Sequence, residues 1–177
     1  LFKGANKSTI WYNANVFRDA GVEPPQDWDQ LLQTAKTLKS FGTPAYSIAG
    51  ADGWTLTDLF ENIYLRTAGG ELYDQLTSHE IPWTHQSVTV ALEHMQEIFQ
   101  DKDNIAGNPL QVEFPTSVSQ VWADPPRAAM VMEGDFVRTE IPEGQQAGQD
   151  YNFFTFPAID GTAPVSYTHL RGHETVL

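Results

Sequence analysis

Helix-like and strand-like patterns alternate along this chain, and the alternation limits its fold more than any other feature. Apolar residues recur at helical spacing in three stretches, 28–38, 56–63 and 88–99. Short apolar stretches that suit strands separate or flank them, at 9–13, 44–49, 128–132 and 152–159. Helices that alternate with isolated short strands indicate an α/β protein rather than a helix bundle. We therefore expect an α/β fold.

Capping residues predict where two of the helices begin. Asp27, with Gln30 three residues on, is the expected N-cap of a helix that ends before Gly42. The central helix is expected to begin at Thr55, and Asp58 would complete a capping box there. Two adjacent glycines at 69–70 are expected to stop it.

The start of the central helix carries the first candidate binding residues. A turn at 52–53 precedes Trp54, and Asp58, Glu61 and Asn62 are expected to share one polar face of the helix. An aromatic ring beside carboxylate and amide groups suits a sugar, because the ring packs on C–H faces and the polar groups bind hydroxyls in pairs. The alternative is a well-capped core helix with a solvated polar face.

Two further aromatic spots are candidate ligand contacts. Trp11 and Tyr12 lie where the first strand ends. Glu133, Asp135 and Phe136 place two acids and a ring directly after a strand of small residues. Core packing is the alternative explanation for the three aromatic residues.

Composition excludes several classes of function. The net charge of −13 argues against binding to nucleic acid or to an anionic membrane surface. The absence of cysteine excludes disulfides, thiolate metal sites and a cysteine nucleophile. No apolar stretch is long enough to span a membrane, so we expect any export signal to precede the chain. Five tryptophans favour a carbohydrate surface.

Motifs for metals, phosphates and cofactors are missing. Asp101 and Asp103 begin like a calcium loop, but Ile105 and Val112 occupy positions where that loop needs oxygen ligands. The histidines lack the spacing of a zinc motif, and no glycine-rich phosphate loop occurs. We expect neither a metal nor a cofactor.

Catalysis by Asp58 and Glu61 is the main alternative to binding. Carboxyl groups three residues apart on a helix point the same way, whereas glycoside hydrolysis needs carboxyls on both sides of the bond. This geometry argues against catalysis by the pair. A glycoside-processing enzyme that uses Asp58 and Glu61 nevertheless stays a rival hypothesis, and a protein-interaction domain is a third.

The chain resembles the extracellular solute-binding proteins of sugar ABC importers, family 1, and among them the α-glucoside type. The resemblance covers nearly all of residues 9–160. The following stretches carry it: Ile10-Trp11-Tyr12-Asn13, Glu23-Pro24-Pro25, Gly53-Trp54, Thr57-Asp58, Leu65-Arg66-Thr67-Ala68-Gly69, His79-Glu80-Ile81-Pro82-Trp83, Glu133-Gly134-Asp135-Phe136 and Phe156-Pro157-Ala158-Ile159.

This resemblance implies a type II periplasmic-binding-protein-like lobe, helix-rich with a small mixed sheet. Residues 1–10 would be a hinge from a missing N-terminal lobe, 11–150 the C-terminal lobe, and 151–164 a return strand toward the other lobe. Residues 165–177 resemble a translated sequencing adapter and are expected to be an artefact. The turn at Trp54 and the spot at Phe136, where relatives often have tryptophan, would line the cleft between the lobes.

The implied function is binding without chemistry. A sugar or oligosaccharide would bridge the lobes and favour their closed arrangement, which would dock on the membrane permease of an ABC importer. The protein would be a monomer, extracellular or periplasmic, and tethered as a lipoprotein through a segment that precedes this chain.

Overall fold

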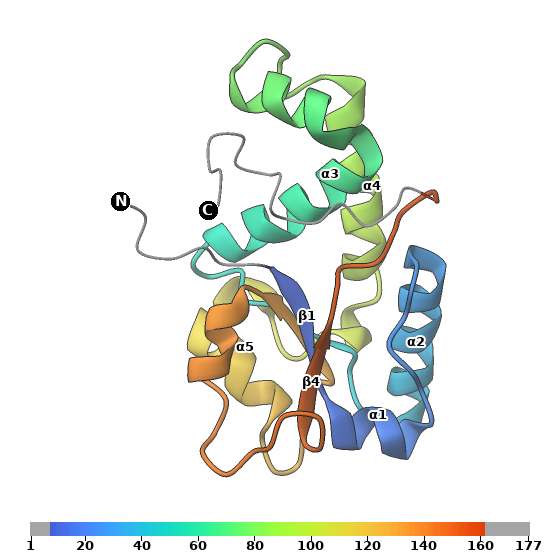
Figure 1. The fold of residues 1–177 in the computed structure, drawn as a ribbon, viewed down its shortest axis with the longest axis vertical. Coiled ribbons are helices and arrows are strands. Elements are labelled where there is room, and N and C mark those ends of the chain that lie inside the picture. Colours follow the sequence, from blue (N-terminus) through green and yellow to red (C-terminus); the bar gives the residue numbers. More distant parts are fainter. Residues whose placement is uncertain (1–7, 162–177) are drawn as a thin grey trace, which may run out of the picture.

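A four-stranded mixed sheet lies at the centre of the computed structural model, which describes residues 8–161 (Figure 1). The strand order is β2-β3-β1-β4. Strand β1 (Thr9–Asn13) runs antiparallel to β3 (Met130–Glu133) and to β4 (Tyr151–Phe154). Strand β2 (Tyr46–Ser47) pairs in parallel with β3. The expected small mixed sheet is confirmed.

Helices make up most of the remaining structure. The α-helices are α1 (Ala14–Ala20), α2 (Trp28–Phe41), α3 (Trp54–Thr77), α4 (Gln86–Phe99) and α5 (Phe114–Val121). Three 3₁₀ turns are η1 (Lys102–Asn104), η2 (Pro109–Gln111) and η3 (Asp135–Thr139). None of the helices within 8–161 is long and apolar enough to cross a membrane. The segment 165–177, which resembles a sequencing adapter, lies outside the described residues.

Helix ends follow the expected caps except at the start of α3. The Asp27 carboxylate accepts a hydrogen bond from the Gln30 N–H at 2.8 Å, and Gly42 closes α2 in the left-handed conformation. The expectation that Thr55 caps α3 is wrong. Gly53, with φ of 77°, is the N-cap residue, and the buried Thr55 hydroxyl donates to the Ala49 carbonyl instead. Thr55 therefore anchors the first turn of α3 to the loop after β2.

A glycine interrupts α3 at the expected place without ending it. Gly69 has φ of 81° and ψ of 171°, values outside the helical region, so the helix breaks there and resumes to Thr77. After this second segment the chain reverses direction and α4 packs against α3 (Figure 1). The contact between α3 and α4 is the most extensive between any two elements of the described structure.

Two hydrophobic cores cover the two faces of the sheet. Successive side chains of β1 point to opposite faces, so Ile10 and Tyr12 pack with α1 to α4, whereas Trp11 packs with α5. The first core contains the fully buried Tyr64, and the second contains Trp122. The sheet thus separates a large helical layer from a smaller one.

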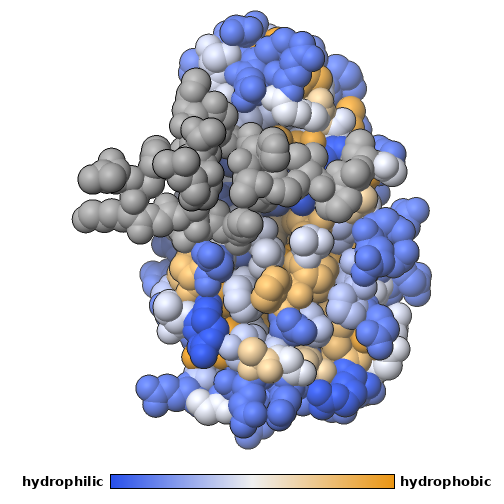
Figure 2. All heavy atoms as spheres, in the orientation of Figure 1, coloured by the Kyte–Doolittle hydropathy of each residue, from blue (hydrophilic) through white to orange (hydrophobic). Residues whose placement is uncertain are grey.

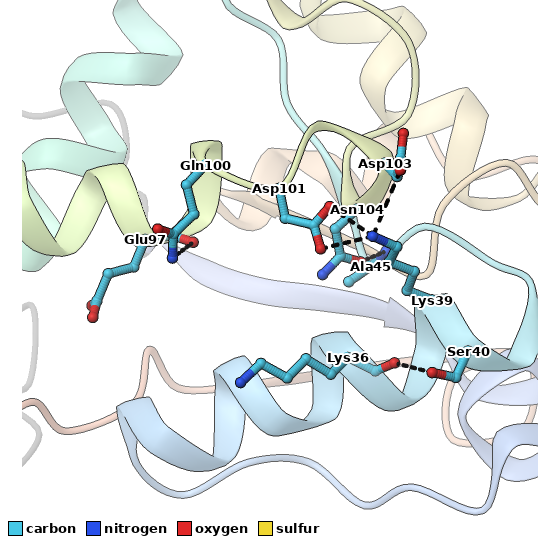
Figure 3. A network of polar contacts seen from close by, with 9 residues as sticks. All are labelled: Lys36, Lys39, Ser40, Ala45, Glu97, Gln100, Asp101, Asp103 and Asn104. Carbon is cyan, nitrogen blue, oxygen red and sulfur yellow. Dashed lines mark hydrogen bonds and ion pairs between the residues drawn. The ribbon is translucent and has the colours of Figure 1, made fainter.

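The aspartates that open the rejected calcium loop form a salt bridge instead (Figure 3). The Lys39 ammonium donates to both carboxylate oxygens of Asp101, at 2.7 and 2.9 Å, and lies 3.7 Å from Asp103. Next to them, Asn104 Oδ1 accepts a hydrogen bond from the Ala45 N–H. Within the described residues no group of three acidic or histidine side chains is placed to hold a metal.

Most of the face shown in Figure 2 is polar, with hydrophobic atoms in its middle. Six large apolar side chains are exposed among the described residues: Phe41, Trp54, Trp83, Leu92, Leu110 and Phe153. Trp54 is the one that clusters with two further aromatic rings near the end of β3.

Candidate ligand-binding site

Three aromatic rings from distant parts of the chain meet at the start of α3. Trp54 is the first residue of α3, Phe114 the first of α5, and Phe136 lies in η3. The Trp54 ring centroid lies 5.5 Å from that of Phe114 and 5.9 Å from that of Phe136. Phe114 and Phe136 meet edge to face at 5.3 Å. We name these three residues the aromatic cluster.

The indole of Trp54 packs against two other rings and is still partly exposed to solvent. Its side chain stays 41 % exposed although two rings pack against it. A large ring held in place but still accessible can offer a flat apolar surface to a ligand. The structure thus brings together Trp54 and Phe136, which the sequence suggested separately.

Hydrogen bonds donated by backbone N–H groups fix the loops that carry the aromatic cluster. The Gly50 N–H donates to the Pro109 carbonyl at 2.8 Å. The Phe114 N–H donates to Asp52 Oδ2 at 2.9 Å, which joins the turn before α3 to the first residue of α5. Sequence reasoning missed Phe114. Pro115 in the first turn of α5 marks a helix start there, but nothing local indicates its contact with residue 52.

Gly134 lets the ring of Phe136 lie against the main chain. A Cβ atom at Gly134 would stand 2.3 Å from Phe136 Cε1 and 2.8 Å from Cδ1. The φ angle of −64° is open to any residue, so space rather than backbone conformation requires glycine here. Glycine at this position therefore sets where the Phe136 ring lies.

Glu133 is a buried acid beside the aromatic cluster. It ends β3, is 2 % exposed, and its Oε2 atom has no hydrogen-bond partner within residues 8–161. Burial and, to a lesser extent, the negative charge of Asp58 raise the pKa of its carboxyl, a hydrogen bond from the Gly134 N–H lowers it, and the net value is about 8. Glu133 is thus protonated at neutral pH.

A small cavity adjoins this acid. Glu133, Thr55 and Leu59 line it together with Ser47, Ile48, Ala49 and Met132. Its volume of about 20 Å³ suits a single water molecule or hydroxyl group. The cavity connects the buried acid to the first turn of α3, one residue from Trp54.

The expected polar face of α3 is only partly present. Asp58 and Glu61 are half-buried near the helix start. The prediction that Asn62 shares their solvated face is wrong, because Asn62 is fully buried and donates from Nδ2 to the Asp58 carbonyl at 2.8 Å. Its Oδ1 accepts from the buried Arg66 guanidinium. Asp135 is exposed at the start of η3.

Trp11 and Tyr12 lie in the cores. Trp11 packs against Tyr151 and Phe153 on one face of the sheet. Tyr12 packs against Phe17 on the other face, with ring centroids 4.4 Å apart. Both are buried, and this burial favours the core-packing alternative for them. Their role as ligand contacts stays a prediction.

The fold is that of an α/β lobe, and the aromatic cluster is its candidate ligand-binding site. The chain belongs to the bacterial extracellular solute-binding protein family, whose model matches residues 2–170. This family membership confirms the resemblance seen in the sequence.

Two curated relatives match most of the chain. It is 32 % identical over 161 residues to the alpha-glucosides-binding periplasmic protein AglE of Rhizobium meliloti, covering 87 % of this chain and 35 % of the relative. It is 30 % identical over 166 residues to the osmoprotective compounds-binding protein GgtB of Synechocystis, covering 90 % and 39 %. The chain therefore spans little more than a third of the length of these relatives.

Solved structures confirm the fold of a type II periplasmic-binding-protein lobe. The bacterial solute receptor AcbH, described as preferring β-D-galactopyranose, superposes with a TM-score of 0.77 at 25 % identity, covering 87 % of this chain and 38 % of AcbH. A chitin oligosaccharide binding protein gives 0.77 at 22 % identity, covering 89 % and 39 %. RafE in complex with raffinose gives 0.70 at 23 %, covering 86 % and 40 %.

Proposed function

We propose that this chain is the C-terminal lobe of a receptor that binds a sugar or oligosaccharide in a cleft between two lobes. The exposed Trp54 ring of the aromatic cluster is the observation that carries the proposal. Residues 1–10 would enter from the N-terminal lobe and 151–164 would return to it. The coverage of little more than a third of each relative supports this division.

The proposed site recognises a sugar by its two kinds of surface. The Trp54 and Phe136 rings pack on the C–H face of a pyranose, while Asp58, Glu61 and Asp135 accept hydrogen bonds from hydroxyls. The chain is 32 % identical in sequence to a relative named for binding alpha-glucosides, and we therefore propose an alpha-glucoside as its ligand. The N-terminal lobe would supply the remaining contacts.

Binding would shift the two lobes toward their closed arrangement, which delivers the sugar to an ABC importer permease. Only contacts made in the closed state can drive that shift. We further propose that the protein works as a monomer outside the cytoplasmic membrane, tethered by a lipid on a segment that precedes this chain. The extracellular character of the family supports the location.

An enzyme that acts on glycosides through Asp58 and Glu61 is the second candidate, because both acids are half-buried near the start of α3. Turnover of a glycoside, lost in Asp58→Asn, would favour this candidate. The membership of a binding family favours the receptor.

A thermal-shift panel tests the proposed function. The intact protein, with its N-terminal lobe, is heated in the presence of α-glucosides, other oligosaccharides and monosaccharides. We expect at least one α-glucoside to raise Tm by several degrees at 100 times its Kd, which corresponds to about 2.7 kcal/mol. The recovered sugar should be unchanged. A flat response to every sugar would contradict the proposal and favour a protein-interaction domain.

Gly134→Ala tests the geometry of the aromatic cluster without removing a polar group. The new methyl group would displace the Phe136 ring, so we expect the intact protein to bind its sugar about tenfold more weakly by isothermal titration calorimetry. Gly70→Ala is the matched control, because a Cβ there meets no atom within 4 Å. Equal affinities for both variants would show that the Phe136 ring does not contribute.

A further inference from the structure

The carboxyl of Glu133 is a polar group that the fold leaves without a complete set of partners. Its Oε2 atom is buried and unpartnered among the described residues, although its cavity is lined by polar Ser47 and Thr55. Thr9 stands directly opposite on β1, and its Oγ1 atom is buried and unpartnered as well. Paired residues of antiparallel strands point to the same face, so the two orphaned atoms share one face of the sheet.

Buried polar atoms without partners are rare because each forfeits its hydration. Two that belong to residues directly opposite each other on neighbouring strands call for an external group. The adjoining cavity accepts one water molecule or one hydroxyl group, and not a ring. Thr55, the neighbour of Trp54, lines this cavity, while the Phe136 ring lies against Gly134, the neighbour of Glu133. A sugar on the aromatic cluster can therefore place one hydroxyl there.

The charges around Glu133 favour its neutral form. From α3 it faces Asp58, and no basic side chain within 8–161 forms an ion pair with it. The cavity wall on β2 and its following loop holds no titratable group. In η3, Asp135 is exposed and the Arg138 guanidinium lies over the Tyr151 ring. The carboxyl thus has a proton to donate at neutral pH.

We propose that the neutral carboxyl of Glu133 donates a hydrogen bond to one ligand hydroxyl in this cavity, so that sugar binding requires a proton on Glu133. The inference rests on the proposed function. Ionisation removes the donor and places a second negative charge beside Asp58. A ligand that also excludes water from the carboxyl favours the protonated form more strongly than the empty site does. Sugar binding and proton binding are therefore coupled.

The test is calorimetric titration of the intact protein with its best sugar at pH 6, 7, 8 and 9. We expect constant affinity at pH 6 and 7, and a loss that approaches tenfold per pH unit above pH 8, where one proton is taken up per sugar. Repeating the pH 9 titration in buffers of different ionisation enthalpy measures that proton directly.

Two variants separate the possible outcomes. Glu133→Gln keeps a donor that does not titrate, so we expect severalfold weaker binding at pH 6 and no fall above pH 8. Glu140→Gln removes an exposed acid just beyond η3 and should keep the wild-type profile. Equal pH profiles for wild type and Glu133→Gln, or no proton uptake by the wild type, would overturn the inference. Absence of binding at every pH would overturn the proposed function instead.

Discussion

Trp54→Ala is expected to weaken sugar binding by the intact protein between 10-fold and 100-fold, and to remove most of the thermal shift. The variant loses the exposed ring face and the support that this ring shares with Phe114 and Phe136. An aromatic contact of this kind contributes about 1.4 to 2.7 kcal/mol, which gives that range of affinity. Calorimetric titration measures the change directly.

Trp83→Ala is the matched control for the loss of an indole. Trp83 is 58 % exposed and packs against Phe60, and none of its ring contacts within 8–161 involves the aromatic cluster. We expect this variant to keep the wild-type affinity. If Trp54→Ala binds as tightly as Trp83→Ala, Trp54 is a structural residue and the site lies elsewhere.

Local signals in the sequence predicted most of the fold. The caps at Asp27 and Gly42 act within one helical turn, and the break at Gly69 follows from the conformational freedom of a single residue. The prediction that Thr55 caps α3 was wrong because two local patterns compete at this position. The sequence fits a capping box at Thr55, but Gly53 is the N-cap, two residues earlier, and the threonine hydroxyl donates to Ala49.

The candidate site could be predicted only in part, because it is assembled from distant segments. Trp54 is recognisable from its place at a turn, but Phe114 joins it through the bond between its N–H and Asp52, 62 residues away. Asn62 is polar and was therefore expected on the polar face of α3. In the structure it is buried and accepts a hydrogen bond from Arg66, and no local pattern indicates this contact. Trp11 lies in the middle of β1 rather than at its end, and α5 covers the face of the sheet that it occupies.

Glu133→Gln is expected to stabilise the 177-residue chain, and to do so far more at pH 8.5 than at pH 5. The pKa of this carboxyl is about 8 in the folded chain, against 4.5 as its ordinary value. Below pH 4.5 both states hold the proton, so the acid costs no stability by this route. Between pH 4.5 and 8 the folded state keeps a proton that the unfolded state has released, and stability falls by about 1.4 kcal/mol per pH unit.

Glutamine does not titrate, so the variant escapes this loss. The difference between the two pH values should approach a few kcal/mol, which urea denaturation at pH 5 and pH 8.5 can resolve. Glu140→Gln, an exposed acid near η3, should change stability little and by the same amount at both values. A stabilisation by Glu133→Gln that does not depend on pH would mean that the carboxyl is ionised in the folded chain, and that another group satisfies it.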